Sequence, residues 1–147
     1  MPSITVRRMA ESDLDVVSSI EMEVFSDPWS RNAFKTDLDN KLAWPIVAEF
    51  EKKVVGYSNI YIVAGEVQIG NFAVAPGFRG RGVAKKMMSE IFEKAAESDC
   101  HNIFLEVRES NKPAMELYKS YGFVSSGKRK DYYTNPRENA IIMVKEL

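Results

Sequence analysis

Hydrophobic and polar positions follow two different periods along the chain, one typical of strands and one typical of helices. The N-terminal stretch SITVRRM alternates with a period of two and predicts a short strand. Apolar residues from Leu14 to Val24 then recur at helical spacing, and Ser12 begins an S-x-x-D pattern that predicts the cap of this helix. A second helix is predicted to begin at Ser30, because Phe34 and Leu38 lie four residues apart on one face. The chain therefore opens with one strand and two consecutive helices.

Three stretches rich in β-branched and aromatic residues come next. They read WPIVAEF, VVGYSNIYIV and VQIGNFAV. A turn at Glu51, Lys52 and Lys53 separates the first two, and a turn around Gly65 separates the second from the third. Such closely spaced strands predict a three-stranded antiparallel meander.

The glycine-rich stretch VAPGFRGRGVAKKMM, at residues 74–88, joins the third of these strands to a long predicted helix from Gly82 to Ser98. A strand, NIFLEV, follows, and then Asn111 is placed to cap a helix through Tyr121 that Gly122 ends. FVSSGKRKDYY and NAIIMVKEL are the last two predicted strands. The order is βααβββαβαββ. The strand, helix and strand around the glycine loop predict a parallel crossover within a mixed sheet.

Composition supports a single folded domain spanning residues 1–147. The chain is 45% hydrophobic and 28% charged, which is the balance of an ordinary globular protein. Its net charge of −1 provides no global attraction to nucleic acid or an anionic membrane, so neither is an expected partner. The N-terminal residues lack the apolar segment of a signal peptide, and no run is long enough to span a bilayer. We expect a cytoplasmic protein.

Cysteine and histidine are too scarce for several kinds of chemistry. One cysteine, Cys100, cannot form an internal disulfide. One histidine, His101, leaves no cluster with the spacing of zinc ligands, so no metal is expected. Both residues lie at the end of a predicted helix, where packing or capping is the expected role.

The glycine loop fits neither of two well-known nucleotide motifs. Val83 and Ala84 stand where a Walker A loop needs Lys and Ser or Thr, and Lys85 stands at the third glycine of the dinucleotide fingerprint. Both motifs nevertheless share a physical basis that the loop retains, namely backbone N–H groups at a helix N-terminus. Arg79, Arg81 and Lys85 add positive charge. The loop suits a phosphate or pyrophosphate, although a solvated strand-to-helix turn would carry the same residues.

Three residues in the C-terminal half invite both a structural and a chemical interpretation. Glu106 stands among apolar residues of a predicted strand, either on a wet face near the sheet end or as a buried carboxylate with a raised pKa that acts as a general base. Tyr118 belongs to a helical apolar stripe and by itself predicts a core aromatic. Asn111 by itself predicts an N-cap.

The loop and the element order together resemble one enzyme family. Residues 79–84, RGRGVA, fit the Q/R-x-x-G-x-G/A pattern of the GNAT family of N-acetyltransferases, and the resemblance extends over nearly the whole chain. It implies an α/β fold with a mixed, mostly antiparallel seven-stranded sheet, helices on both faces, and acetyl-CoA as co-substrate without a metal. It also implies that the pantetheine arm and acetyl group bind along Phe72, Ala73 and Val74. The residues implied to bind the CoA pyrophosphate are Arg79, Gly80, Arg81, Gly82, Val83, Ala84 and Lys85.

Three further stretches resemble the ribosomal-protein-alanine N-acetyltransferase branch of this family. They are LEVRESNKPAMELYKSYGF, FSDPWSRNAF and RKDYYTNPRENAIIM. The resemblance implies that Glu106 is the general base, Tyr118 is the general acid and Asn111 contacts CoA. It also implies an acceptor groove flanked by Pro28, Trp29, Ser30, Tyr132 and Tyr133.

The resulting hypothesis is an acetyl-CoA-dependent N-terminal protein acetyltransferase, acting on the N-terminal alanine of a small-subunit ribosomal protein. Proton energetics favour an α-amine, because a group of pKa about 7.8 is roughly a tenth neutral at pH 7, against about one lysine in 2,500. Two alternatives stay open. One is an acetyltransferase for a small amine, such as a polyamine, an amino acid or an antibiotic. The other is a non-catalytic CoA-binding module in which Glu106 and Tyr118 only pack.

Overall fold

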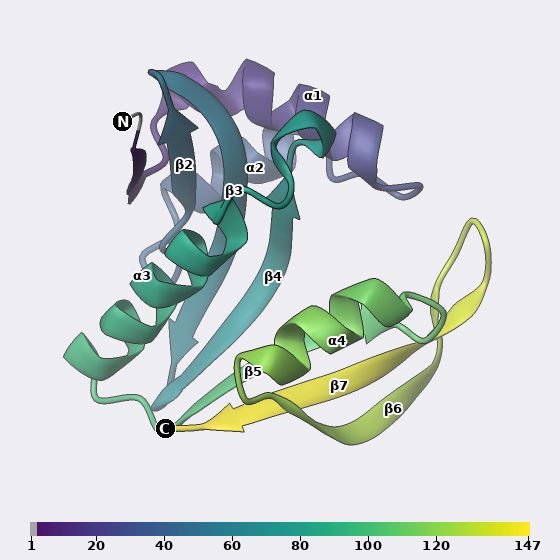
Figure 1. Cartoon of the computed structure of the whole chain (residues 1–147). Coiled ribbons are helices and arrows are strands. Elements are labelled where there is room, and N and C mark those ends of the chain that lie inside the picture. The colour runs from purple at the N-terminus through teal and green to yellow at the C-terminus, as the bar shows by residue number, and fades with distance from the viewer. Residues whose placement is uncertain (1–2) are drawn as a thin grey trace.

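A computed structural model describes residues 3–147 of the chain. The predicted order βααβββαβαββ is confirmed, with two short 3-10 turns added (Figure 1). The elements are β1 (Ile4–Arg8), η1 (Glu11–Asp13), α1 (Leu14–Val24), α2 (Arg31–Leu38), β2 (Ile46–Phe50), β3 (Lys53–Val63), β4 (Glu66–Val74), η2 (Pro76–Phe78), α3 (Val83–Glu97), β5 (Asn102–Arg108), α4 (Lys112–Ser120), β6 (Val124–Tyr133) and β7 (Glu138–Glu146).

All seven strands form one sheet in the order β1-β2-β3-β4-β5-β7-β6. Every neighbouring pair is antiparallel except β4 and β5, which are parallel because α3 carries the chain back between them. The expected mixed, mostly antiparallel sheet is therefore confirmed. Within residues 3–147, the one parallel pair lies on either side of the glycine loop, so the loop follows the end of the central strand, β4.

Helices cover both faces of the sheet (Figure 1). On one face, α3 packs through Met87, Ile91 and other apolar residues, and α4 packs through Met115 and Tyr118, all within one large core cluster. On the other face, α1 and α2 cover β2 to β4 with a second cluster that includes Phe34. Figure 1 shows that α1 and α2 do not extend over β5, β7 and β6. These two helices therefore leave that face of the C-terminal strands uncovered.

Most predicted helix ends are confirmed by side-chain caps. The Ser30 hydroxyl accepts a hydrogen bond from the Ala33 amide at 3.1 Å, and the side-chain oxygen Oδ1 of Asn111 accepts one from the Ala114 amide at 3.2 Å. Gly122, after the end of α4, has a φ of 97°, the left-handed conformation that favours glycine at this position.

The predicted cap at Ser12 is wrong. The chain turns earlier, at Ala10, whose amide donates to the Asp13 carboxylate at 2.7 Å. Arg7 fixes this carboxylate through two hydrogen bonds of 2.8 and 2.9 Å, and this pairing holds the pKa of Asp13 below its usual range. A contact from β1 therefore decides where the first helical turn begins. A smaller difference is that Lys53, predicted in a turn, already belongs to β3.

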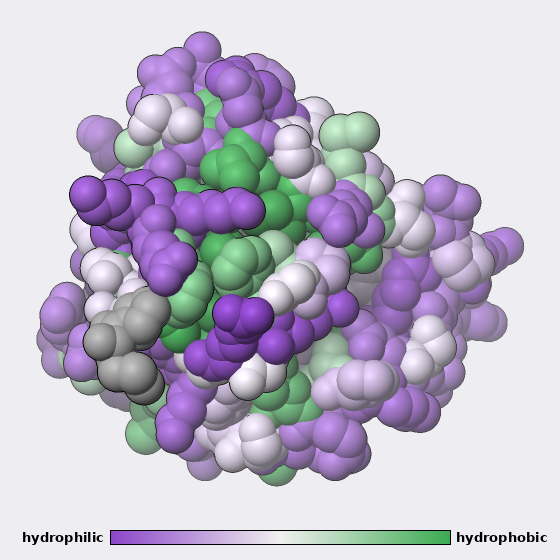
Figure 2. Space-filling model, turned by 45° about the horizontal axis from the view of Figure 1, so that its top comes forward, coloured by the Kyte–Doolittle hydropathy of each residue, from purple (hydrophilic) through white to green (hydrophobic). Residues whose placement is uncertain are grey.

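The surface combines apolar and charged regions. With the top of Figure 1 turned forward, green apolar residues gather in the middle of the view between purple hydrophilic ones (Figure 2). Among residues 3–147, no helix is long and apolar enough to cross a membrane.

Candidate active site

β4 and β5 are paired over only part of their length and then diverge. Their register ends at Ile69 opposite Leu105, although β4 continues to Val74 and β5 to Arg108. Beyond the register, the edge of β4 that faces β5 carries backbone N–H and C=O groups without strand partners. An extended ligand can pair with such an edge, as an added strand would.

A bulge at Gly70 changes the direction of the side chains at the point where the strands part. Asn59 of β3 lies opposite Asn71, whereas the next residue, Ile60, lies opposite Ile69, so Gly70 is an extra residue in β4. A side chain there would meet Tyr61 at 3.0 Å and the Trp29 indole at 3.2 Å. Glycine is therefore the residue that lets the α1–α2 loop approach the strand closely.

Because of the bulge, Phe72 and Val74 pack toward the core of α3 and α4, while Ala73 packs toward α1 and α2. The three residues predicted to hold the acyl end of the cofactor thus lie in β4 just beyond the point where the strands part. Their backbone is the edge that faces the gap.

The glycine loop forms the start of α3 and is built for close approach of a ligand. Gly80 and Gly82 have φ values of 76° and 86°, and Gly82 is the N-cap residue. No heavy atom lies within 4 Å of where a Cβ would stand at either glycine, so backbone conformation rather than crowding requires glycine here. Val83 is buried at the first helical position and anchors the turn. The amides of this turn suit an anion, as predicted.

The basic residues of the loop are arranged differently from one another. The Arg79 guanidinium turns back and donates to the Val74 carbonyl oxygen at 3.3 Å. That of Arg81 lies over the rings of Phe50 and Phe78, at 5.9 and 5.4 Å from their centres. Lys85 is exposed on the first turn of α3. Two of the three predicted positive charges, those of Arg79 and Arg81, therefore also contact the loop or its aromatic neighbours.

Tyr118 of α4 lies on the face of β4 that α3 and α4 cover. Its ring centre is 6.0 Å from that of Phe72 and 6.0 Å from that of Phe123, both in edge-on geometry. The side chain is buried, and burial is the main cause that raises the pKa of its phenol above the usual value. Tyr118 therefore stays protonated at neutral pH and has a proton to donate. It is a core aromatic, and its position also suits the predicted chemical role.

Glu106 lies in β5 directly after the last residue paired with β4, on the opposite strand face from the buried Leu105. Its side chain is 24% exposed and accepts a hydrogen bond from Nε of Arg129 at 3.0 Å. Glu106 was expected either on a solvent-exposed face or as a buried carboxylate. It is partly exposed, and so matches neither expectation fully. Arg129 reaches it diagonally from β6, since Arg129 lies opposite Ala140 of the intervening β7 whereas Glu106 lies opposite Ile142.

The residues predicted to flank the acceptor lie on two sides of the candidate site, in the α1–α2 loop and at the end of β6. Trp29 packs on Phe34 with ring centres 5.4 Å apart and lies beside the β4 bulge, while Tyr132 is 52% exposed on β6. Burial raises the pKa of Tyr132, and the nearby Glu106 carboxylate raises it further. For Tyr133, burial and the charge of Glu106 raise the pKa to about 12. Pro28 and Ser30 flank Trp29, and the Ser30 hydroxyl is occupied as the cap of α2.

Arg108, which the sequence patterns did not indicate, joins these two sides. Its guanidinium donates to Asp27 at 3.2 Å in the α1–α2 loop and to the Thr134 carbonyl oxygen at 2.8 Å in the β6–β7 loop. It also lies 4.5 Å from the centre of the Tyr133 ring. A charged residue at the end of an apolar strand was the available signal, but its partners lie 26 and 81 residues away.

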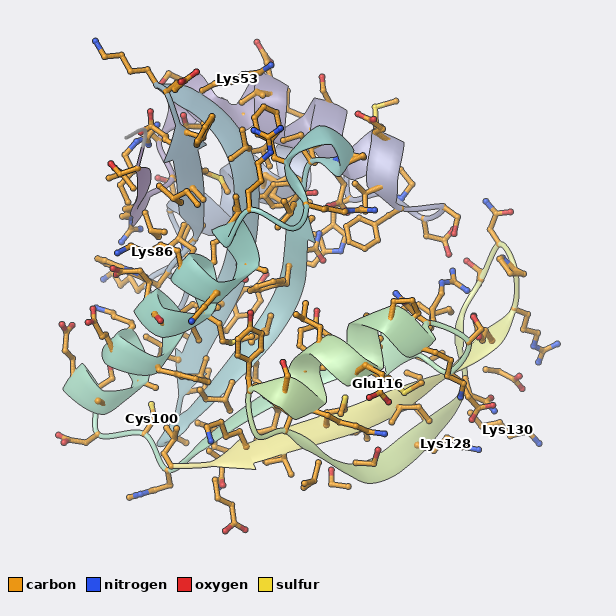
Figure 3. All side chains as sticks on the ribbon, viewed as in Figure 1. Lys53, Lys86, Cys100, Glu116, Lys128 and Lys130 are labelled. Atoms are coloured by element: carbon orange, nitrogen blue, oxygen red, sulfur yellow. The ribbon has the colours of Figure 1, made fainter. Side chains whose placement is uncertain are left out.

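The remaining reactive side chains lie elsewhere. Cys100 is buried near the end of α3, and Figure 3 shows it on the opposite side of the molecule from Lys128 and Lys130 on β6. The part of the chain that the structure describes contains no group of three or more His, Cys, Asp or Glu residues placed to hold a metal ion.

The chain is similar to known acetyltransferases in both sequence and structure. Residues 14–123 match the acetyltransferase (GNAT) family. A Bacillus subtilis protein, provisionally named a ribosomal protein bS18-alanine N-acetyltransferase, is 39% identical over 139 residues, covering 94% of this chain and 92% of the relative. A Haemophilus ducreyi protein named a ribosomal protein bS18-alanine N-acetyltransferase is 31% identical, with 94% and 97% covered. The crystal structure of the ribosomal-protein-S18-alanine N-acetyltransferase from Escherichia coli superposes with a TM-score of 0.90 at 27% identity, covering 98% of this chain and 94% of that one.

Proposed function

Because the chain belongs to the acetyltransferase (GNAT) family, we propose that it acetylates the N-terminal alanine of a small-subunit ribosomal protein. The protein is an acyltransferase that uses acetyl-CoA as its acyl donor. Residues 1–147 act as a single catalytic domain in this proposal, and a ribosomal acceptor places the reaction in the cytoplasm.

The observation that carries the proposal is the placement of Tyr118 and Glu106 about the diverging strands. Tyr118 packs against Phe72 on the face covered by α4, and Glu106 lies on the other face of β5, near Tyr132. Acetyl-CoA that enters past α3 and α4 and an acceptor that enters past the α1–α2 and β6–β7 loops therefore meet where β4 and β5 diverge. This arrangement supports direct transfer within a ternary complex.

In the proposed reaction, Glu106 removes a proton from the acceptor ammonium, directly or through a water molecule. The amine nitrogen then forms a bond to the thioester carbonyl carbon, while a backbone N–H of residues 72–74 donates to the carbonyl oxygen as negative charge develops there. The carbon–sulfur bond breaks, the Tyr118 hydroxyl donates its proton to the departing sulfur, and the amine nitrogen returns a proton to Tyr118, directly or through water. The products are the acetylated amine and CoA thiol, and no covalent enzyme intermediate is required.

The proposal predicts turnover on a short peptide that begins with alanine and carries a ribosomal N-terminal sequence. Release of CoA thiol should be continuous, and mass spectrometry should show one acetyl group on the α-amine. The same peptide with a blocked N-terminus but with its lysines free is the matched control and should not react. No turnover on any peptide with a free N-terminus would contradict the proposal. Turnover on a polyamine alone would favour a small-amine enzyme, and CoA binding without transfer would favour a binding module.

The glycine loop gives a prediction that concerns cofactor affinity alone. Replacing Gly82 with valine puts a β-branched residue at a φ of 86°, a conformation that disfavours ordinary residues by roughly 1–2 kcal/mol. The loop then shifts its amides, and the Kd for acetyl-CoA, measured by isothermal titration calorimetry, should rise about tenfold. Gly77→Ala is the control, since Gly77 is not among the positive-φ glycines and has open space for a Cβ. An equal effect of both substitutions would contradict the assigned role of the loop.

A further inference from the structure

A buried carboxylate lies on the apolar face of α1. Glu21 is 1% exposed and occupies the same helical stripe as Leu14 and Val17, both 0% exposed. A buried carboxylate lowers stability unless hydrogen bonds satisfy it, and an apolar residue of similar size would fill this position without that requirement. The presence of a glutamate therefore needs an explanation beyond packing.

The Glu21 carboxylate is satisfied by three different segments. Its Oε1 accepts from the Tyr57 hydroxyl at 2.6 Å and from Nδ2 of Asn71 at 2.9 Å. Its Oε2 accepts from the backbone amide of Trp29 at 3.0 Å and from Nδ2 of Asn71 at 2.9 Å. All these partners are donors, which suits the ionised form because a carboxylate only accepts. Burial raises the pKa of Glu21, and the hydrogen bonds act in the opposite direction.

Two of these partners belong to the two sides of the candidate active site. Trp29 lies in the α1–α2 loop, on the acceptor side, beside the bulge. Asn71 is the first residue after the bulge and directly precedes residues 72–74, the edge assigned to the acyl group. Its backbone carbonyl oxygen is also held, by the Ser58 hydroxyl at 2.7 Å. One carboxylate thus fixes the acceptor loop and the donor strand relative to each other.

We propose that Glu21 is a positioning residue for acetyl transfer, which holds the α1–α2 loop against β4 so that the acceptor amine and the thioester carbonyl meet in one geometry. This inference rests on the proposed function for its acceptor, and it concerns the placement of the reactants rather than any proton. Small displacements of reacting groups reduce rates steeply. The expected result of loosening the link is therefore a loss of transfer out of proportion to the loss of cofactor binding.

The chain offers a matched control in a second buried carboxylate. Asp37 of α2 is 8% exposed and accepts from Nδ2 of Asn59 at 2.7 Å and from the Tyr61 hydroxyl at 2.5 Å. Both partners belong to β3, so Asp37 joins a helix to the sheet without linking the acceptor loop to β4. Asp37→Asn and Glu21→Gln make the same chemical change, from carboxylate to amide.

The test compares both variants with the wild type well below their melting temperatures. Both should melt at lower temperature, because an amide cannot accept all the bonds that a carboxylate accepts. Glu21→Gln should lower kcat/KM for the peptide by about 10- to 100-fold, with the Kd for acetyl-CoA changed less than about threefold. Asp37→Asn should leave both kcat/KM for the peptide and the Kd for acetyl-CoA within about threefold of the wild-type values. A Glu21→Gln enzyme whose kcat/KM equals that of Asp37→Asn would overturn the proposal.

Two further measurements keep the test decisive. Amide hydrogen exchange at residues 25–30 should accelerate in Glu21→Gln and not in Asp37→Asn, and unchanged exchange in Glu21→Gln would overturn the proposal without reference to any acceptor. If Glu21→Gln does not fold, Asn71→Ser removes the strand side of the same link and should give the same kinetic loss. If the wild type acetylates no N-terminal peptide, the proposed function fails, while exchange still decides the role of Glu21.

Discussion

Replacing Glu106 with glutamine is expected to lower kcat for peptide acetylation by about a hundredfold or more, the range in which a general base contributes. Glutamine keeps the size of the side chain but cannot take up the proton of the acceptor. The Kd for acetyl-CoA should stay within about twofold, since Glu106 lies on the other face of β5 from the α4 side on which Tyr118 and Phe72 meet. Steady-state kinetics on the peptide and calorimetry with acetyl-CoA measure the two quantities separately.

The ion pair between Glu106 and Arg129 does not prevent this role. The Arg129 side chain is 56% exposed, and an exposed pair of this kind contributes about 0.2–1 kcal/mol. An incoming ammonium can therefore displace the guanidinium at a modest loss of affinity, no more than about fivefold in KM. The interaction orients the carboxylate in the free enzyme without removing it from the reaction.

Glu109→Gln is the control for Glu106→Gln. Glu109 lies three residues further along the chain, pairs with Lys128 at 2.7 Å and is 39% exposed, so the substitution removes the same charge close by. We expect its kcat to stay near the wild-type value. If Glu106→Gln also kept its kcat, Glu106 would not be the base.

Local sequence patterns were sufficient to predict the fold because its elements follow the periods of their own residues. The stripe that includes Met87 and Ile91 predicted α3, and the alternation of Ile103, Leu105 and Val107 predicted the buried face of β5. The parallel pairing of β4 and β5 followed from the single helix between them. The cap at Ser12 was wrong, because Arg7 of β1 holds the Asp13 carboxylate that accepts from the Ala10 amide, and the turn at Lys53 was placed one residue too far.

The candidate site was less accessible to the same reasoning, since its geometry depends on contacts between distant residues. Glu21 and Asn71 are 50 residues apart, and no periodicity connects them. A charge within an apolar helical stripe was a local signal for Glu21, but it did not indicate a partner. The Gly70 bulge was equally hidden, because an extra residue in a strand appears only when the opposite strand is in place.

Replacing Tyr118 with phenylalanine is the second prediction with a large expected effect, a fall in kcat of about 10- to 100-fold. The substitution removes only the hydroxyl, and the ring packing with Phe72 and Phe123 remains possible. Because burial raises the pKa of Tyr118 further above that of a thiol, the hydroxyl is fully protonated but gives up its proton reluctantly. We therefore expect the proton to reach the sulfur only after the carbon–sulfur bond has largely broken, so that before then the hydroxyl assists by hydrogen bonding, and the effect is smaller than that of Glu106→Gln.

Two measurements on Tyr118→Phe distinguish assistance to the leaving thiolate from packing: its melting temperature, and its kcat with acyl donors that carry different thiols. Tyr121→Phe, a substitution of the same kind at the end of the same helix, is the control and should leave kcat unchanged. A thiolate whose thiol has a lower pKa needs less assistance in leaving. With an acyl donor of that kind, the difference in kcat between Tyr118→Phe and the wild type should be smaller. If the gap were the same with both donors, or if kcat fell only in proportion to stability, Tyr118 would be a packing residue and another donor would have to assist the thiolate.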